Sequence, residues 1–316
     1  MFSLLSFGEA LVDFLPDNIE ATSYTPLAGG APANVAVAFA KLGGNSYFAG
    51  GISTDNFGTM LMQQLTEYGV NTSFVSQISD AISAIVLVGL DQTGERSFNF
   101  YRHHTADTQY TSADIANINW RDIGVFHFCS NTLTDETMYQ NTLCAIKAAK
   151  SQNALISFDV NLRQQLWDDL TLLPARVSAC IEKSDIIKLS KDEAQYLAQL
   201  QQLNIEQYTS QLLAQGVKLV VITDGANAVQ FISPSFAGQQ KVPEIKALDT
   251  TAAGDSFIAS LLFYLTQYAG SNAIRVIQTI EKQALVTAAV KFASQCGALT
   301  CQRKGAFTAL PLITEL

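Results

Sequence analysis

Short apolar runs bounded by turn residues alternate with amphipathic stretches along most of this 316-residue chain. The apolar runs predict β-strands, and they are Leu4–Phe7, Tyr47–Ala49, Ile123–Phe128, Leu155–Phe158, Ile186–Leu189, Leu219–Thr223 and Val229–Ile232. Apolar residues recur at helical spacing between them, as in Val35, Ala38, Phe39 and Leu42, and in Phe57, Met60, Leu61, Leu65 and Tyr68. We therefore predict an α/β fold with a mostly parallel sheet covered by helices on both faces, and with ligands at the carboxyl ends of its strands.

One region departs from this alternation. The apolar run Ile82–Leu90, the turn residues Asp91–Gly94 and the alternating segment Arg96–Tyr101 predict a β-hairpin. Together with the loop-rich stretch Asp13–Leu27, this hairpin predicts a small sheet that projects from the main body. The sequence shows no internal repeat and no linker, so we expect residues 1–316 to form a single domain. Its β-lid is expected to come from residues 13–28 and 82–108.

Composition acts mainly by excluding classes of protein. The hydrophobic share of 48% and the charged share of 15% suit a chain with a buried core and exclude a largely disordered one. The net charge is −9 and no basic cluster stands out, so nucleic acid is not an expected partner. A small anionic ligand is compatible with this charge, because backbone N–H groups, a few arginines and a metal ion can hold it.

Targeting signals and cysteine usage both favour the cytoplasm. The first basic residue is Lys41, so we expect no secretory leader. The apolar run Phe257–Leu265 is interrupted by Ser260 and too short to span a bilayer, so no membrane partner is expected. The five cysteines form no C-x-x-C pair, and the three histidines are not at zinc-ligand spacing from them. We interpret the thiols as free and mostly buried.

The glycine-containing segments carry the chemistry, although neither is a P-loop or a G-x-G-x-x-G fingerprint. Asp249-Thr-Thr-Ala-Ala-Gly-Asp255 precedes a helical face formed by Phe257, Leu261, Tyr264, Leu265 and Tyr268. A turn of small residues before a helix leaves backbone N–H groups unpaired, and with the helix dipole these make an anion site. Asp255 at the helix start either caps the helix or accepts a proton from a hydroxyl that attacks a bound phosphoryl group.

A second segment, Gly29-Gly-Ala-Pro-Ala-Asn34, also opens a helix. Two consecutive glycines let a ligand approach the backbone closely. The side chain of Asn34 offers a donor and an acceptor, as recognition of a pair of hydroxyl groups requires. The alternative is a tight turn in which Asn34 caps the helix.

Gly29–Ala36 and Asp249–Ser260 match the two signatures of the ribokinase (PfkB) family of carbohydrate kinases, which the chain resembles along its whole length. Further motifs are similar to those of bacterial fructokinases: Gly8-Glu-Ala-Leu-Val-Asp13; Phe98-Asn-Phe-Tyr-Arg102 with Ala106-Asp107; Asp159-Val-Asn-Leu-Arg163 with Trp167; Leu189-Ser-Lys-Asp-Glu193; Thr223-Asp-Gly225; and Cys296-Gly-Ala-Leu-Thr300 with Gly305 and Ala309-Leu-Pro311. The resemblance implies a Rossmann-like, ribokinase-like α/β fold with a small β-sheet lid.

Two positions depart from the family pattern. Ala252 replaces the commonest glycine, and Ser190 replaces the asparagine of N-x-x-E.

The resemblance also implies an activity and a set of site residues. It implies an ATP-dependent sugar kinase, most similar to fructokinases, in which Asp255 takes the proton and the backbone of Ala252, Ala253, Gly254 and Asp255 holds the transferring phosphoryl group. Sugar contacts are expected from Asp13, Gly29, Gly30, Asn34, Arg102 and Arg163. Nucleotide contacts are expected from Lys188, Glu193, Thr223, Gly225, Ala252, Gly254, Thr300 and Gly305. Mg²⁺ is expected near Glu193 through water, and a monovalent cation such as K⁺ at backbone carbonyls of Asp249 and Thr251.

Other functions fit parts of the same pattern. A 2-keto-3-deoxygluconate kinase shares the lid segment and would bind its substrate carboxylate with Arg102 and Arg163. A nucleoside kinase, or a non-catalytic sugar- or nucleotide-binding protein, uses the same fold. Fructose is favoured by the Asp159–Arg163 motif, by the segment Cys296–Pro311 and by Asp13, because a carboxylate attracts hydroxyl donors and repels an acid. A homodimer formed through the β-lid is a further expectation.

Single residues also allow simpler interpretations. Asp159 and Asn161 would then only cap the next element, Arg163 would form a surface ion pair, and Glu193 would be a surface residue at a helix start. Cys296 and Cys301 would be packing groups rather than ligands. If Ala252 has a positive φ, its strain is about 1–2 kcal/mol.

Overall fold

The computed structural model describes residues 3–18, 20–90, 96–267 and 273–316, and within these ranges the strands form two sheets. The larger sheet contains β1 (Ser3–Phe7), β4 (Asn45–Ser53), β5 (Asn71–Ile78), β8 (Val125–Cys129), β9 (Leu155–Asp159), β10 (Ile186–Ser190), β11 (Leu219–Thr223), β12 (Val229–Ile232) and β13 (Ala237–Gln240). The smaller sheet contains β2 (Leu11–Pro16), β3 (Tyr24–Gly29), β6 (Ile85–Leu90) and β7 (Arg96–Tyr101).

Helices connect and cover these strands. The α-helices are α1 (Ala31–Lys41), α2 (Asn56–Glu67), α3 (Ser112–Ala116), α4 (Glu136–Ser151), α5 (Leu173–Ile181), α6 (Lys191–Leu200), α7 (Ile205–Ala214), α8 (Ala253–Gln267), α9 (Ala273–Ile280) and α10 (Gln283–Cys301). Short 3₁₀ helices are η1 (Ala106–Thr108), η2 (Trp120–Asp122), η3 (Ser130–Leu133), η4 (Gln164–Leu166), η5 (Leu170–Leu172) and η6 (Ile313–Glu315).

The large sheet has the order β13-β12-β11-β10-β9-β8-β1-β4-β5. Its seven strands from β11 to β5 pair in parallel, and β12 and β13 extend it antiparallel at one edge. The prediction of a mostly parallel α/β sheet is confirmed. Because β4 and β8 flank β1 on opposite sides, the strand order reverses there, and this is the place where doubly wound folds bind ligands.

Alternate side chains of the parallel strands enter two separate cores. Leu4 of β1 packs in a core with α1, α8 and α10, whereas Leu5 of the same strand packs in a core with α4, α5, α6 and α7. The second core holds a parallel stack of Phe128 and Phe158 with ring centroids 4.6 Å apart. Full burial of one such leucine or phenylalanine contributes about 1.5–3 kcal/mol. These two cores are the reason that the strands are continuous apolar runs.

Each predicted strand overlaps a strand of the large sheet, but the pattern missed β5 and β13. Both are edge strands with partly exposed, polar sequences, so neither carries the apolar signal of a central strand. The stretch Asp13–Leu27, predicted as loop-rich, forms most of the antiparallel pair β2–β3. The predicted turn Asp91–Gly94 and the helical position Tyr268 lie outside the described residues.

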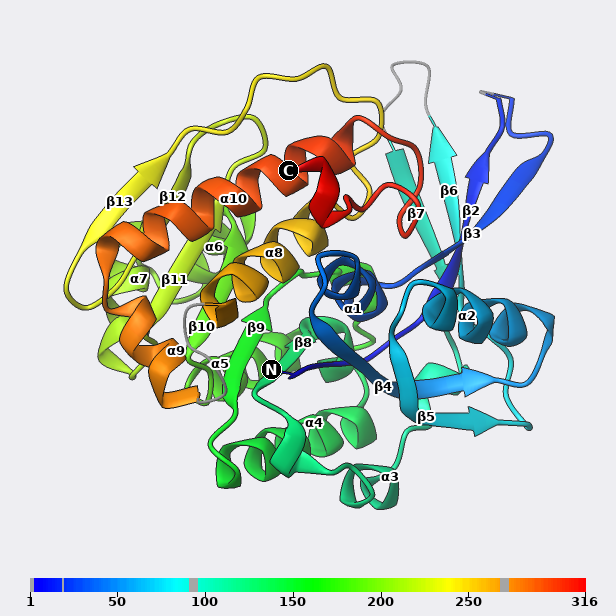
Figure 1. Ribbon diagram of the computed structural model, residues 1–316. Helices are drawn as coiled ribbons and strands as arrows, with labels where there is room; N and C mark the ends of the chain where they lie inside the picture. Colours follow the sequence, from blue (N-terminus) through cyan, green and yellow to red (C-terminus); the bar gives the residue numbers. More distant parts are fainter. Residues whose placement is uncertain (1–2, 19, 91–95, 268–272) are drawn as a thin grey trace.

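The small sheet, in the order β3-β2-β6-β7, stands beside the large one, on the side of α1 and α2 (Figure 1). The chain passes from β1 to β2 through Gly8, Glu9 and Ala10, and from β3 to α1 through Gly30. It returns from β7 towards η1 through residues 102–105. The small sheet is therefore joined to the large one close to the carboxyl end of β1.

Helix α10 is long and apolar enough to cross a bilayer if only length and composition are considered. It packs along α8, and Val286, Val290 and Cys296 are buried in the core that the two helices share. A core helix meets the same criteria, so one such helix is weak evidence of a membrane span.

Candidate active site

The turn that precedes α8 has the strained geometry that its sequence allows. Ala252 has a φ of +59°, whereas Gly254 does not have a positive φ. The strain at Ala252 is about 1–2 kcal/mol. The Ala253 N–H donates to the Thr250 carbonyl at 3.3 Å, and the Ser256 N–H donates to the Ala252 carbonyl at 2.8 Å. The first turn of α8 thus directs the N–H groups of its N-terminus at whatever lies before the helix.

Asp255 lies in this first turn, where it contacts a residue from the other glycine-containing segment. Its Oδ2 accepts a hydrogen bond of 2.7 Å from Nδ2 of Asn34. Burial raises the pKa of Asp255, against the hydrogen bond from Asn34 and the positive charges of Lys188 and Arg163, which lower it. A raised pKa makes a carboxylate a stronger base, which suits it to accept a proton in catalysis.

Lys188 and Asp159 form a buried ion pair beside this helix. They are register partners on the adjacent strands β10 and β9, and Lys188 Nζ lies 2.8 Å from Asp159 Oδ2 and 3.1 Å from Oδ1. A Cβ added to Gly254 would lie 2.9 Å from Lys188 Nζ, so the glycine leaves room for the ammonium group. Burial raises the pKa of Asp159 to about 7, although the charge of Lys188 opposes this shift. Asp159 is therefore the partner of Lys188, not a simple cap.

A polar cavity of about 300 Å³ opens at the carboxyl ends of β1, β8, β9 and β10. Phe98 and Phe100 of the small sheet form part of its wall. Its charged and polar lining comes from Glu9, Asp13, Asn34, Asn131, Asn161, Arg163, Lys188 and Asp255, and the turn 250–254 completes it. This cavity has the size and polarity to hold a molecule rich in hydroxyl groups.

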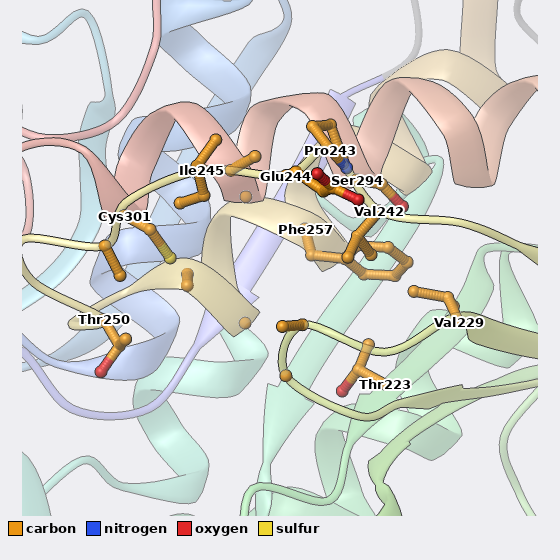
Figure 2. Close-up of a pocket in the computed structure, with 17 residues that line it drawn as sticks. Thr223, Val229, Val242, Pro243, Glu244, Ile245, Thr250, Phe257, Ser294 and Cys301 are labelled. Atoms are coloured by element: carbon orange, nitrogen blue, oxygen red, sulfur yellow. The ribbon is translucent and has the colours of Figure 1, made fainter.

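A second, apolar cavity of about 470 Å³ lies on the other side of the same turn. Figure 2 shows Val242 and Pro243 on one side of it, Thr223 and Val229 on another, and Phe257 between them. The two cavities share Thr250, Ala253 and Gly254. A group that passes from one cavity to the other must cross the N-terminus of α8.

The structure brings most of the predicted sugar residues together. Asp13, Gly30, Asn34 and Arg163 line the polar cavity, as do the predicted catalytic residues Ala252, Ala253, Gly254 and Asp255 and the predicted nucleotide residue Lys188. Gly29 is not in the lining. The Asp13 carboxylate occupies the space that a Cβ of Gly29 would need, so this glycine makes room for a cavity residue.

Arg102 is not among the residues that line the polar cavity, so its expected contact with the sugar stays a prediction. Its Nε forms an ion pair of 2.5 Å with Asp107, and its Nη1 donates to the Asn131 carbonyl at 3.0 Å. Its side chain is 5% exposed. The guanidinium binds protein groups behind the cavity wall, and these bonds hold the end of β7 in place.

Two of the predicted nucleotide residues lie outside the lining of the apolar cavity. Thr223, Gly225 and Gly254 line the apolar cavity, but Thr300 and Gly305 do not. The Thr300 hydroxyl is buried between α8 and α10, where it bonds Ser256 Oγ at 2.8 Å. The Gly305 N–H donates to Asp249 Oδ2 at 2.9 Å.

Other residues form that wall in their place. On α10 they are Ser294, Gly297, Ala298 and Cys301, and on the loop after β13 they are Val242, Pro243, Glu244, Ile245 and Ala247. Cys301 was interpreted as a packing group. The loop carries no motif, so no signal in the sequence pointed to it.

Glu193 has a structural role that the N-x-x-E comparison did not reveal. Its Oε2 accepts from the Ser190 N–H and its Oε1 from the Leu162 N–H, each at 2.7 Å. Ser190 Oγ in turn accepts from the Glu193 N–H at 3.1 Å, which completes a capping box. Ser190 therefore caps α6, and Glu193 links the segment after β9 to this helix.

Metal-binding residues are sparse. The described residues contain no group of three or more His, Cys, Asp and Glu side chains that could hold a metal ion. The Asp249 carboxylate is buried and accepts from the Thr251 N–H at 2.8 Å as well as from Gly305. Asp249 thus shapes the loop whose carbonyls were predicted to bind a monovalent cation.

Comparison with known proteins agrees with this geometry. Residues 1–313 match the sequence pattern of the pfkB family carbohydrate kinases. The chain belongs to this family. The PfkB-family kinase is 36% identical over 309 residues to a fructokinase of Vibrio alginolyticus, with 98% of this chain and 96% of the relative covered.

Solved structures of other fructokinases share the fold. A fructokinase of Xylella fastidiosa with bound ATP matches with a TM-score of 0.94 and 34% identity, covering 99% of this kinase and 96% of that chain. A fructokinase of Vibrio cholerae O395 bound to fructose, ADP and calcium matches with a TM-score of 0.87 and 34% identity, covering 100% and 97%. The ribokinase-like fold with its smaller second sheet is confirmed.

Proposed function

We propose that this PfkB-family kinase transfers the γ-phosphoryl group of ATP to a hydroxyl group of fructose. The observation that carries the proposal is the meeting of the polar and apolar cavities at Thr250, Ala253 and Gly254, with Asp255 on the polar side. A sugar in one cavity and a nucleotide in the other would react across the N-terminus of α8. The relatives that hold fructose with ADP, or ATP, support this assignment of ligands.

In this mechanism Asp255 accepts the proton of the attacking hydroxyl as the hydroxyl oxygen bonds to phosphorus. Negative charge that develops on the transferred group meets the N–H groups of Gly254 and Asp255 at the helix N-terminus. Lys188, which Asp159 holds next to Gly254, supplies a positive charge at the same place. Asp13, Gly30, Asn34 and Arg163 hold the sugar from the other walls of the polar cavity.

The adenine and ribose would occupy the apolar cavity, with Thr223 and Gly225 on its wall. The residues present suit Mg²⁺ that arrives with the nucleotide, because this ion is usually held by phosphates, waters and only one or two carboxylates. Glu193 would contact it through water, since each of its oxygens keeps a second lone pair beyond the N–H group that it accepts. When bound, Mg²⁺ neutralises charge on the β- and γ-phosphates. Potassium would bind at the carbonyls of the loop from Asp249 to Thr251.

A sugar acid fits the polar cavity less well than a neutral sugar. In the 2-keto-3-deoxygluconate alternative, Arg102 or Arg163 would bind the substrate carboxylate, but Arg102 pairs with Asp107 and donates to the Asn131 carbonyl. Arg163 remains on the wall, and Glu9 and Asp13 place two carboxyl groups beside the ligand. A carboxylate substrate would meet repulsion there, which favours a neutral ketose.

A coupled assay of ADP release over fructose, 2-keto-3-deoxygluconate, ribose and adenosine, with and without potassium, tests the proposal. The kcat/KM for fructose is expected to exceed that of each other acceptor by at least about tenfold, which corresponds to 1.4 kcal/mol of preferential binding of the transition state. Preferred turnover of the keto acid would overturn the choice of fructose and keep the kinase. Absence of ADP release with every acceptor would favour a non-catalytic binding protein.

We further propose that residues 1–316 act as one domain, that the small sheet is its lid, and that the enzyme works in the cytoplasm, where ATP is supplied. Tyr101 of β7 and Ile82 are exposed on this lid, at 57% and 66%, which supports a homodimer formed through it. Sedimentation equilibrium of the intact protein and of Tyr101→Ser tests the dimer. A monomer at assay concentrations would refute it.

A further inference from the structure

We propose that Glu9 and Asn131 form a subsite of the polar cavity that recognises a hydroxyl group of the substrate and selects it as a hydrogen-bond donor. The inference rests on the proposed function, because it names the part of the sugar site that distinguishes neutral sugars from acids. Neither residue was among those that the sequence motifs pointed to as sugar ligands.

Both side chains are buried and both line the polar cavity. Glu9 is 1% exposed and Asn131 is 6% exposed. They come from neighbouring strands, since Glu9 follows β1 and Asn131 follows β8, and β1 pairs with β8 in parallel. A Cβ on Gly30 would lie 2.6 Å from the Glu9 carbonyl, so the close approach of Gly30 holds the Glu9 backbone in place.

The hydrogen bond between the two side chains determines which atoms are left for a ligand. Asn131 Nδ2 donates to Glu9 Oε1 at 2.8 Å. Because the amide nitrogen of Asn131 faces Glu9, its amide oxygen faces away from it. Asn131 Oδ1 is buried and has no hydrogen-bond partner within the part of the chain that the structure describes.

The Cys129 thiol lies 3.9 Å from Glu9 Oε2 and is a weak donor at that range, so Glu9 can accept a stronger hydrogen bond from a ligand. Asn34 Oδ1, which also lines the cavity, is a further buried acceptor with no partner among the described residues. Buried acceptors in folded proteins are almost always paired, so the amide oxygens of Asn131 and Asn34 on one cavity point to a ligand that brings donors.

The charges behind the wall favour a neutral donor over an anion. Arg102 lies close enough to Glu9 to influence it electrostatically, but its guanidinium bonds Asp107 and the Asn131 carbonyl rather than the cavity. It therefore offsets the charge of Glu9 without offering a hydrogen bond to a ligand. A sugar hydroxyl donates to Glu9 or to Asn131 Oδ1, whereas a substrate carboxylate at this place would meet acceptors alone.

Glu9→Gln tests the subsite because glutamine has the same shape. Its amide oxygen can keep the bond from Asn131, and its amide nitrogen replaces the acceptor Oε2 with a donor. The KM for fructose should rise about 10- to 100-fold, as expected for a lost hydrogen bond to a charged group, while the KM for ATP and the melting temperature change little. Asp185→Asn is the matched control, since Asp185 is a largely buried carboxylate that accepts from the Ile156 N–H at the amino end of β10.

A panel of monodeoxy fructose analogues makes the test specific. The analogue that lacks the recognised hydroxyl should bind wild-type enzyme poorly, and Glu9→Gln should weaken it no further. Every other analogue should bind Glu9→Gln more weakly than it binds wild-type enzyme, by the same factor as fructose. Uniform loss across the whole panel, or an unchanged KM for fructose, would overturn the proposal.

Asn131→Ala gives an independent measurement if Glu9→Gln melts below the assay temperature. It removes Oδ1 and should give the same analogue-specific pattern with wild-type KM for ATP, and a uniform loss would again overturn the subsite. Failure of the wild-type enzyme to use fructose would refute the proposed function itself. Fructose turnover without any analogue-specific effect would refute the subsite alone.

Discussion

Asn34 Nδ2 donates to Asp255 Oδ2 across 2.7 Å, and the two residues are 221 positions apart in the chain. This bond joins the start of α1 to the start of α8, so the two glycine-containing segments form one unit. It also gives Asn34 a second task. The residue lines the sugar cavity, and its amide lowers the pKa of the proposed base against the effect of burial.

Asp255→Asn should lower kcat by about 10²–10⁴-fold, because an amide cannot accept the proton of the attacking hydroxyl. Binding of ATP and of fructose should persist, as measured by titration calorimetry. Asp192→Asn, on the exposed first turn of α6, is the control. Turnover within a few-fold of wild type would show that Asp255 only caps α8.

Asn34→Ala should shift the acidic limb of the kcat/KM profile to higher pH. The hydrogen bond from Asn34 lowers the pKa of Asp255, so its removal raises that pKa. The base must be ionised to act, and activity is then lost earlier as the pH falls. Asn45→Ala serves as control because Asn45 bonds Ser3 at the amino-terminal ends of β4 and β1, away from the cavity. If the acidic limb of the kcat/KM profile stays where it is in wild type, Asn34 does not influence the pKa of Asp255.

Gly254→Ala should reduce kcat by at least about tenfold, since the new methyl group would displace the ammonium of Lys188 from the transferred phosphoryl group. Stability should stay level or rise, because alanine is better than glycine in a helix by about 1 kcal/mol. Urea unfolding and the ADP-release assay measure the two effects separately. Loss of stability in proportion to activity would argue against a catalytic reason for this glycine.

Glu193→Gln should weaken the hydrogen bonds from Ser190 and Leu162 and lower the free energy of unfolding by about 1–3 kcal/mol. We also expect the Mg²⁺ concentration that gives half the maximal rate to rise several-fold, because the substitution removes the charge of a carboxylate that would contact the ion through water. If stability falls and the magnesium dependence stays that of wild type, Glu193 acts only as a cap.

His127 should make the fold sensitive to acid. Burial, assisted by the charge of Lys188, lowers its pKa to about 3, whereas an unfolded chain takes up the proton near pH 6.5. The unfolded state binds the proton more readily, so stability is complete above pH 6.5 and falls by up to about 1.4 kcal/mol per pH unit between pH 6 and 4. The free energy of unfolding in urea, measured across this pH range, should fall more steeply for wild type than for His127→Gln, by that slope. An equal pH dependence in the two proteins would contradict the low pKa of His127.

The sequence predicted best those features that depend on one segment alone. Central strands such as Ile186–Leu189 are buried on both faces, so they are recognisable as apolar runs, and the turn at Asp255 combines small residues with a helical pattern. The ion pair between Arg102 and Asp107 was not predicted, because a motif position does not reveal which partner the guanidinium has in the fold. Glu9 and Asn131 were missed because only the pairing of β1 with β8 brings them together.

The joints of the small sheet have a consequence for how substrate binding and domain movement relate. Two of the connections between this sheet and the rest of the chain pass through Glu9 and Gly30, and both residues line the polar cavity. Any rotation of the small sheet about these joints alters the walls that grip the ligand. We therefore expect ligand affinity and the orientation of the small sheet to be coupled in this enzyme. A ligand that tightens the joints would be measured both as binding and as closure, with one free energy shared between them.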